Sequence, residues 1–438
     1  MAALSRRRTS WGWLLAVALV AVPAWKCVEP LFRSGPMPVS RETSRLGREL
    51  FVHRWTERDP STGGDGLGPV FNASSCVECH NQGGVGGGGP AGNNVTEYSL
   101  AKLHPKGLPQ SGVVHAHAIN TAFQETLRHV HSSLPSQTSL SLAALTGLVD
   151  VSITQRNTPA LFGDGQIDAI ADDDIIALER KNATARIVRL DSGGRSKIKG
   201  RVARLADGRI GRFGWKLEFA TLGDFVKAAC ANELGLSNPG RPQATPLGHP
   251  EYRATGVDLT DEQCGLMADF IRGLAPPFEV IPRDRQLADK ARTGKSQFSS
   301  IGCADCHSET LGPAQGLYSD LLLHDLGSGL EGRAGYAARP DEAPSEHNDS
   351  DDSQRPSPSE WRTAPLWGVA DSAPYLHDGR AASLEQAIQL HGGEASGVSE
   401  RFKALSPVDQ LSIISFLNTL RAPVADPAEQ ASQNLAVR

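Results

Sequence analysis

Two Cys-x-x-Cys-His motifs constrain this 438-residue chain more than any other feature of its sequence. In each motif, one helical turn presents two thiols and is followed directly by an imidazole, which is the attachment pattern of c-type haem. A zinc site would need a second pair of ligands nearby, and none follows either motif closely. A thiol redox pair would not need a histidine after both motifs. The sequence therefore predicts two covalently attached haems, one joined to Cys76 and Cys79 with His80 as an iron ligand, and one joined to Cys303 and Cys306 with His307 as an iron ligand.

Similar helical segments flank the two motifs. Before each motif, a helical segment carries a glycine four residues ahead of a phenylalanine, namely Gly47 and Phe51 in the first half and Gly294 and Phe298 in the second. After each motif, an apolar helix with three- and four-residue spacing is predicted. Each of these helices begins at a Ser or Thr N-cap, Thr260 or Ser406, and ends close to an Ala-Pro pair.

This repeat predicts a mostly α-helical fold built from two cytochrome c-like domains, residues 41–277 and 286–423. The first domain carries a long insertion, in which alternating apolar residues and Asp-Gly turns over 185–219 predict a small β-hairpin region. The glycine-rich stretch 83–94 is expected to form a flexible loop directly after the first motif. The polar, acidic stretch 341–360 is expected to be a surface loop or a disordered excursion.

The N-terminus has the order of residues that is typical of export. Three arginines at positions 6–8 precede an apolar run from Trp11 to Trp25. The run is short for a membrane span, so a signal cleaved after Ala24 and an uncleaved anchor both agree with it. Residues 1–28 are therefore interpreted as a signal peptide or an N-terminal membrane anchor. The remainder is expected in the periplasm or outside the cell, either free or anchored to the inner membrane.

Composition restricts the partners and the disulfide chemistry. With 44 basic and 49 acidic residues, the net charge of −5 gives no general electrostatic reason to bind nucleic acid. Outside the two motifs, Cys230 and Cys264 are available to pair, and in an oxidising compartment they are expected to form a disulfide. The alternative is a pair of buried free thiols.

The second axial ligands of the two irons are expected to be histidines or to be absent, because methionines are scarce. Met1 and Met37 lie in or beside the leader, and Met267 lies in an apolar helix where core packing is expected. The histidines that follow the first motif are His104, His115, His117, His129 and His131, and those that follow the second are His324, His377 and His391. A helix capped by Ser383 ends at His391, where a histidine also has a structural alternative, since its imidazolium form interacts favourably with a helix C-terminus.

At these residues the chain resembles the bacterial superfamily of dihaem cytochrome c peroxidases and methylamine-utilisation (tryptophylquinone-maturing) enzymes. More closely, it resembles the dihaem c-type oxidoreductase family often labelled thiol oxidoreductases. The resemblance covers residues from about 45 to 422, through the stretches "FNASSCVECH", "QRNTPALFG", "GRFGWK", "YSDLLLHDLG", "WRTAPLWG", "APYLHDGRA" and "LEQAIQLHGGEA". No cysteine pair outside the haem motifs has redox spacing, so the thiol label has no independent support.

The resemblance implies axial ligands. In the peroxidases, the residue fourteen positions after the His of Pro-Tyr-x-His-Asp-Gly is the distal ligand of the C-terminal haem. Here that residue is His391, which implies a bis-histidine haem with His307. The distal His of the N-terminal haem lies sixteen positions after the motif His, but Thr96 stands there, so that ligand does not carry over. Substitution by His104 or His115 and an open five-coordinate iron remain as alternatives.

The resemblance also implies further site residues. Trp215 in "GRFGWK" corresponds to a tryptophan that relays electrons between the haems, although a core aromatic is the simpler alternative. Arg156, Gln155 and Asn157 are candidates to line the distal pocket of the N-terminal haem or to fix a turn. A calcium ion between the haems is a superfamily trait whose ligands are mostly backbone carbonyls.

Three functions are compatible with these features. The first is a peroxidase-like dihaem oxidoreductase, in which the C-terminal haem exchanges electrons with a partner protein, such as a small cytochrome or a quinol-linked donor. Its N-terminal haem would react with peroxide, oxygen or an organic substrate. The second is a pure electron-transfer cytochrome without its own catalysis. The third, from the associations of the family, is an accessory to iron acquisition or to another periplasmic redox pathway.

Overall fold

The structure is a computed structural model, and its described residues lie between Val39 and Pro423. They are 39–100, 111–124, 151–183, 187–189, 195–246, 249, 251–332, 336 and 355–423. The described residues form one unit by their mutual contacts. The expected leader, most of the acidic stretch and His104, His129 and His131 lie outside the described residues. No helix in the described ranges is long and apolar enough to cross a membrane.

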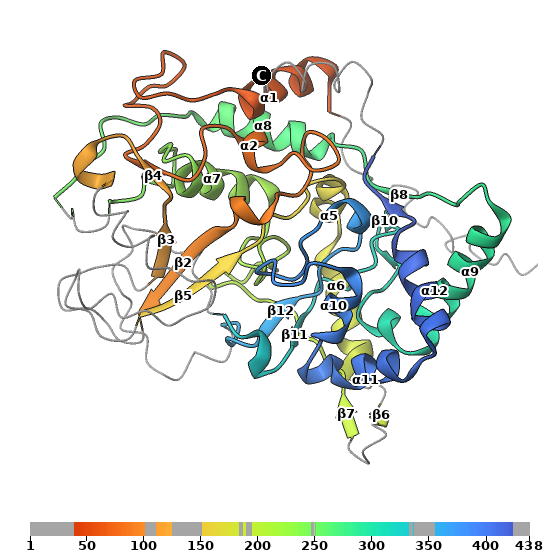
Figure 1. Ribbon diagram of the computed structural model, residues 1–438. Helices are drawn as coiled ribbons and strands as arrows, with labels where there is room; N and C mark the ends of the chain where they lie inside the picture. Colours follow the sequence, from red (N-terminus) through yellow and green to blue (C-terminus); the bar gives the residue numbers. More distant parts are fainter. Residues whose placement is uncertain are drawn as a thin grey trace, which may run out of the picture. The chain divides into compact units, whose positions relative to one another are not determined.

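Two long helices of the first half cross at a glycine. Helix α1 (Arg41–Val52) and helix α8 (Asp261–Arg272) lie side by side in Figure 1. A Cβ atom on Gly47 would lie only 2.0 Å from the carbonyl oxygen of Leu266, so only glycine permits this approach. Helix α8 begins at the predicted N-cap, where the Thr260 hydroxyl accepts from the backbone N–H of Gln263 at 3.1 Å.

The second half repeats the same arrangement. Helix α9 (Arg285–Ser300) crosses helix α12 (Pro407–Leu417), and a Cβ on Gly294 would lie 1.8 Å from the carbonyl oxygen of Ser412. The predicted N-cap Ser406 accepts from the backbone N–H of Asp409 at 3.2 Å. The predicted repeat of flanking helices is therefore present in the structure, which adds a glycine crossing in each half, while the domain boundaries 41–277 and 286–423 stay a prediction.

We expect alanine at either crossing to destabilise the protein. Gly47→Ala or Gly294→Ala places a Cβ into a backbone carbonyl, and overpacking of this kind typically costs about 1–3 kcal/mol. Denaturant unfolding of the haem-loaded protein measures the loss. Gly265→Ala, on the same helix as the first crossing, is the control, because nothing lies within 4 Å of its Cβ position. Equal stability of the crossing variants and this control would contradict the interpretation.

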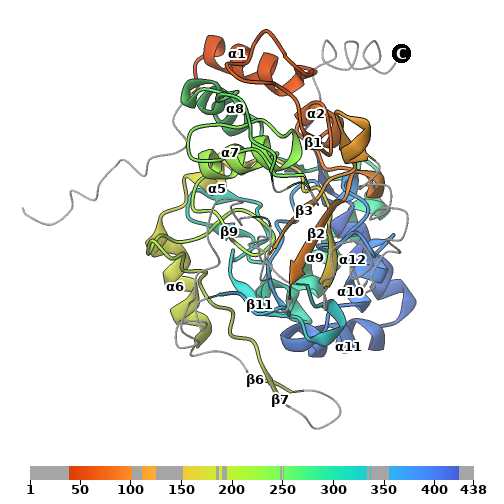
Figure 2. The same ribbon diagram turned by 90° about the vertical axis from the view of Figure 1, so that its left-hand side faces the viewer.

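The insertion of the first half carries small antiparallel strands. Strands β3 (Ser111–Val114), β2 (Val95–Leu100) and β5 (Val151–Arg156) form a three-stranded sheet, visible in Figure 2. Strands β6 (Ile187–Arg189) and β7 (Arg195–Lys197) pair as a hairpin, which confirms the prediction for 185–219. The three-stranded sheet was not predicted, because its strands come from segments far apart in the sequence.

The remaining elements are two more helices of twelve residues each and a set of shorter helices and strands. Together with those above, they make helices the main regular structure of the described chain beside small strands, which agrees with the expected mostly α-helical fold. They are α2 (Cys76–Cys79), α5 (Asp164–Asp168), α6 (Asp172–Ala183), α7 (Leu222–Glu233), α10 (Leu384–Gln389), α11 (Ser396–Ala404), η1 (Ala91–Asn93), η2 (Cys303–Asp305), η3 (Ser328–Leu330), η5 (Val369–Asp371), η6 (Gly393–Ala395), β1 (Val70–Phe71), β4 (His117–Ala118), β8 (Phe278–Glu279), β9 (Thr310–Leu311), β10 (Ala314–Gln315), β11 (Leu323–Asp325), β12 (Glu360–Arg362) and β13 (Leu420–Arg421).

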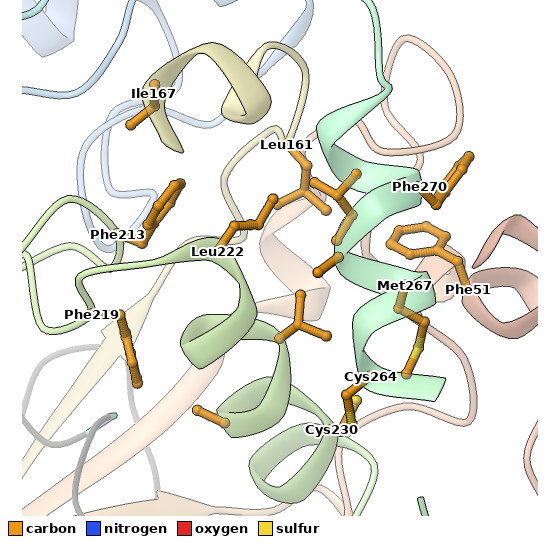
Figure 3. Packing of buried hydrophobic residues seen from close by; sticks show 14 of the residues in the cluster. Phe51, Leu161, Ile167, Phe213, Phe219, Leu222, Cys230, Cys264, Met267 and Phe270 are labelled. Carbon is orange, nitrogen blue, oxygen red and sulfur yellow. The ribbon is translucent and has the colours of Figure 1, made fainter. Parts of the chain in front are cut away.

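A large apolar core surrounds helices α7 and α8. Figure 3 shows Met267 on α8 close to Phe51 of α1, and Met267 is 1% exposed. Met267 therefore packs in the apolar core, as expected, and its side chain also lines the cavity at His80. A second apolar cluster in the other half includes Phe298 and Phe416, whose ring centroids are 5.4 Å apart. The corresponding pair in the first half, Phe51 and Phe270, is separated by 5.2 Å.

Candidate functional site

The first Cys-x-x-Cys-His motif lines a buried cavity. Helix α2 is a single turn that starts at Cys76 and ends at Cys79, and both side chains line the cavity together with His80. Nδ1 of His80 lies 3.1 Å from the carbonyl oxygen of Pro159 and 3.2 Å from that of Gly87, so it is the protonated nitrogen. Burial lowers the pKa of His80 to about 4, which keeps the imidazole neutral. Nε2 therefore carries the free lone pair that an iron needs.

The middle of the glycine-rich stretch after His80, residues 85–89, is buried and held by hydrogen bonds, which corrects the expectation of a flexible loop for this part. The backbone N–H of Gly86 donates to the carbonyl oxygen of His80 at 2.9 Å, and the carbonyl of Gly87 accepts from the His80 ring. A Cβ on Gly87 would lie 1.7 Å from the Gln82 carbonyl oxygen. Glycines stand here because the chain folds tightly against the histidine.

The second motif has the same geometry. Cys303, Cys306 and His307 line another cavity, and Nδ1 of His307 donates to the carbonyl oxygen of Tyr318 at 2.9 Å. Burial lowers the pKa of His307 to about 4. The ring of Phe298 lies 6.2 Å from the His307 ring at 54°, and Phe51 lies 6.3 Å from the His80 ring at 49°. The two motif histidines are thus oriented by equivalent contacts.

His391 lines the same cavity as His307. It follows helix α10, whose N-cap Ser383 accepts from the backbone N–H of Gln386 at 3.1 Å, as predicted. Nδ1 of His391 donates to the Ala387 carbonyl oxygen at 2.7 Å. Burial lowers the pKa of His391, which disfavours the imidazolium that would interact with the helix C-terminus. A neutral imidazole with a free Nε2 is instead the form that binds iron.

His377 has a different environment. Its ring stacks on Trp361 with the centroids 3.6 Å apart and the planes at 10°. Burial and the nearby cations Arg156, Arg380 and Lys216 hold the pKa of His377 well below its ordinary value. Its carbonyl oxygen accepts from the backbone N–H of Asn157 at 2.7 Å. These contacts join the His-Asp-Gly turn to the first half of the chain.

Both cavities fit a haem bound by these residues. Each is lined mainly by apolar side chains and offers two thiols and a neutral imidazole with a free Nε2. Burial raises the pKa of the Cys76, Cys79 and Cys303 thiols to about 12, as expected in an apolar environment. The cavity volumes are about 260 Å³ at His307 and about 120 Å³ at His80.

The cavity at His80 is bordered by charged groups rather than by a second histidine. Among its described lining residues, His80 is the only imidazole. Nη2 of Arg156 lies 3.0 Å from Oε2 of Glu97, and both side chains are buried. Burial raises the pKa of Glu97 to about 7, although Arg156 opposes this effect. The other polar residues that line this cavity include Glu218, Glu233 and Tyr336.

None of the described candidates for the second ligand of the His80 iron lines this cavity. Nε2 of His115 donates to the carbonyl oxygen of Asn232 at 2.8 Å, and His115 does not line the cavity. Thr96 is buried on strand β2, where it pairs with Gln155, and His104 lies outside the described residues. The described chain therefore offers no second imidazole to this iron, and the alternatives are an open coordination site or one of the histidines outside the described residues, His104, His129 or His131.

The structure brings two of the three predicted catalytic residues to the cavity. Arg156 and Trp215 line it, and Trp215 also lines the cavity of the second motif. Gln155 does not, because neighbouring residues of a strand point to opposite faces, and its Oε1 accepts from Asn94 at 3.3 Å. Glu97 was missed by the sequence analysis, since no pattern joins it to Arg156 before strands β2 and β5 pair.

Cys230 and Cys264 lie side by side between helices α7 and α8 (Figure 3). Both are buried free thiols, and their side chains are within hydrogen-bonding reach of one another. The predicted disulfide therefore remains a prediction, for which the two residues are suitably placed.

In exported protein we expect these two thiols to be joined. Exchange with a disulfide-bearing oxidant would transfer two electrons and two protons to the oxidant, which leaves as two thiols, and the new Sγ–Sγ bond would stabilise the fold by about 3–4 kcal/mol. The intact mass of unreduced protein should be lower by two hydrogens than that of reduced protein. Alkylation of Cys230 and Cys264 without prior reduction would contradict the bridge, and a Cys264→Ala variant is the control.

Comparisons with known proteins agree with this chemistry. A family model described as "Di-haem oxidoreductase, putative peroxidase" matches residues 130–420. A cytochrome c551 peroxidase of Pseudomonas aeruginosa is 28% identical over 151 residues, which cover 33% of this chain and 38% of the peroxidase. The chain thus matches little more than a third of that relative's length.

Two solved structures align with most of the chain at low similarity. A hydrazine synthase of Kuenenia stuttgartiensis has a TM-score of 0.41 at 15% identity, over 93% of this chain and all of that chain. A MauG-like protein associated with microbial copper homeostasis has a TM-score of 0.39 at 16% identity, over 92% of this chain and 98% of the other.

Proposed function

Because the chain belongs to the di-haem oxidoreductase family, we propose that it is an exported dihaem c-type cytochrome with peroxidase-like oxidoreductase activity. The haems would be attached covalently through the two Cys-x-x-Cys-His motifs. The proposal includes two cytochrome c-like domains, 41–277 and 286–423. The glycine crossings at Gly47 and Gly294 and the equivalent phenylalanine contacts of His80 and His307 support this duplication.

The contrast between the two cavities carries the proposal. Among the histidines that line the C-terminal cavity, His307 and His391 are neutral and have their Nδ1 bound to a backbone carbonyl, and together they would hold an iron in a six-coordinate, electron-transferring state. The N-terminal cavity offers His80 on its own among the described imidazoles, beside the buried pair of Glu97 and Arg156. An iron held there would keep a position for a substrate.

The residues around His80 suit proton transfer. When bound, the haem supplies one-electron redox chemistry and a coordination site for a peroxide or oxygen-type substrate. Glu97, in its basic form, would accept a proton from the substrate and later return it. Arg156 would hold the Glu97 carboxylate in place and balance its charge. Apolar walls would exclude water from this exchange.

The other parts of the proposal concern electron flow and location. Trp215, whose indole N–H donates to the Asn157 carbonyl oxygen at 2.8 Å, borders both cavities and would relay electrons between them. A small cytochrome or a quinol-linked donor in the periplasm would supply the electrons, with residues 1–28 as the export signal or membrane anchor. The proposal also includes a calcium ion between the haems, which the family resemblance implies and whose ligands would be mostly backbone carbonyls.

EPR of the oxidised holoprotein tests the function. We expect one low-spin and one high-spin ferric signal, and a spectral change of the high-spin haem when hydrogen peroxide is added. A pure electron-transfer cytochrome would instead give two low-spin signals and no response to peroxide. That second result would contradict the proposed enzymatic activity and favour the electron-transfer alternative.

A further inference from the structure

His324 lies at the edge of the C-terminal cavity and is clamped by two carboxylates. It belongs to strand β11 and is 3% exposed. Its Nε2 lies 3.0 Å from Oδ2 of Asp320, and its Nδ1 lies 2.9 Å from Oε2 of Glu394. We call these three residues the His324 clamp.

The clamp fixes the charge of the ring. A neutral imidazole has one N–H and one lone pair, and the lone pair would point at a carboxylate oxygen. Both ring nitrogens face carboxylates here, so both must donate, and the ring is an imidazolium. Burial alone would raise the pKa of Glu394, but the hydrogen bond from His324 lowers it below its ordinary value. The clamp therefore holds one positive and two negative charges.

The clamp lies against a haem attachment residue. Nδ1 of His324 is 3.7 Å from Sγ of Cys306, and both His324 and Glu394 line the cavity that contains His307 and His391. Cys306, Asp320 and His324 also form the one group of three potential metal-ligating side chains within the described ranges. Since the Cys306 sulfur is committed to the haem in the proposed function, this group cannot act as a separate metal site.

The clamp also ties the insertion of the first half to this cavity. Oε2 of Glu394 accepts from the backbone N–H groups of Lys199 at 2.9 Å and Gly200 at 3.3 Å. Gly200 has a positive φ of 55°, and a Cβ there would lie 2.6 Å from the His324 ring. Backbone therefore covers the ring closely and excludes water, which preserves the strength of its electrostatic interactions.

We propose that His324 is a charged positioning residue that, with Asp320 and Glu394, sets the reduction potential of the C-terminal haem. The inference rests on the proposed function, because it requires a haem attached at Cys306. A ferric haem carries one more positive charge than a ferrous haem. A buried cation at its edge therefore favours the reduced form and raises the potential, while a buried carboxylate has the opposite effect.

Removal of the positive charge of the clamp and removal of one of its negative charges should consequently shift the midpoint potential of the C-terminal haem in opposite directions. His324→Gln removes the positive charge and should lower the midpoint potential of the C-terminal haem. Glu394→Gln removes a negative charge, keeps an acceptor for the ring, and should raise that potential. A purely structural clamp would not give shifts of opposite sign. The second variant also keeps the test valid if His324→Gln fails to fold.

The experiment is a redox titration of purified holoprotein, followed through the low-spin EPR signal assigned to the C-terminal haem. Intact mass confirms two attached haems in each variant beforehand. His115→Gln, a buried histidine hydrogen-bonded to Asn232 and outside this cavity, is the matched control and should leave the potential unchanged.

Opposite shifts in the two clamp variants support the inference. Unchanged potentials, or shifts in the same direction, overturn it and leave the proposed function intact. If only Glu394→Gln folds, a raised potential supports the inference, and an unchanged or lowered one overturns it. Absence of a haem at Cys303 and Cys306 in the wild-type protein overturns the proposed function and the inference together.

Discussion

Replacement of His391 by alanine should convert the C-terminal haem from low spin to high spin. His391 and His307 line one cavity, each has its Nδ1 bound to a backbone carbonyl, and burial lowers the pKa of both. Removal of one of two strong axial ligands leaves the iron five-coordinate or water-bound, and either state is high spin. EPR should then show loss of the whole low-spin signal of that haem.

Two further variants sharpen this test. His391→Met should retain a low-spin iron with a higher reduction potential, because a thioether replaces an imidazole. His377→Gln, in the same stretch of sequence, should leave the spin state unchanged and lower stability through loss of the stack on Trp361. Added imidazole should restore the low-spin signal of His391→Ala. An unchanged spectrum in His391→Ala would exclude His391 as a ligand.

The local features of the fold could be predicted from the sequence. Thr260 and Ser406 cap helices as expected, because an N-cap depends on residues that are neighbours in the chain. Gly47 and Gly294 were recognised by their spacing from phenylalanine, and the structure gives the reason, which is a backbone crossing with no room for a side chain. The hairpin within 185–219 was predicted from alternation and turn residues alone.

The parts that depend on tertiary contacts were not predictable in the same way. Glu97 reaches Arg156 only because strand β2 pairs with strand β5, whose residues lie more than fifty positions further along the chain. Gln155 and Arg156 are neighbours in sequence but lie on opposite faces of strand β5. The buried glycine-rich segment was interpreted as flexible, because composition does not reveal that His80 donates to the Gly87 carbonyl.

Replacement of Glu97 by glutamine should produce the largest loss of peroxide reactivity, about 10²–10⁴-fold, which is the usual range for a lost general acid–base group. Glu233 also lines the cavity, but its Oε2 accepts from Asn72 at 2.7 Å and its carboxylate interacts with Tyr336. Oε2 of Glu97 has an ion pair with Arg156 and no hydrogen bond, so it is available for a substrate proton.

The pH dependence of the wild-type protein should identify the same group. The pKa of Glu97 is about 7, and its basic form is the one that accepts a proton. The rate of reaction with peroxide should therefore rise as the pH increases through about 7 and fall below it. Glu97→Gln should lose this step, and Glu97→Asp should keep it at a lower rate. Stopped-flow measurement of the high-spin haem band between pH 5 and 9 tests both statements.

Matched controls distinguish a loss of proton transfer from a loss of folding stability. Gln155→Ala alters the neighbour of Arg156 on the opposite face of strand β5 and should change the rate less than about twofold, because Gln155 does not line the cavity. Glu97→Gln removes the carboxylate that balances the buried charge of Arg156, and the loss of such a charge pair destabilises a protein by about 3–5 kcal/mol. Haem content and unfolding are therefore measured alongside the rate. A large loss in Glu233→Gln with none in Glu97→Gln would assign proton transfer to Glu233 instead.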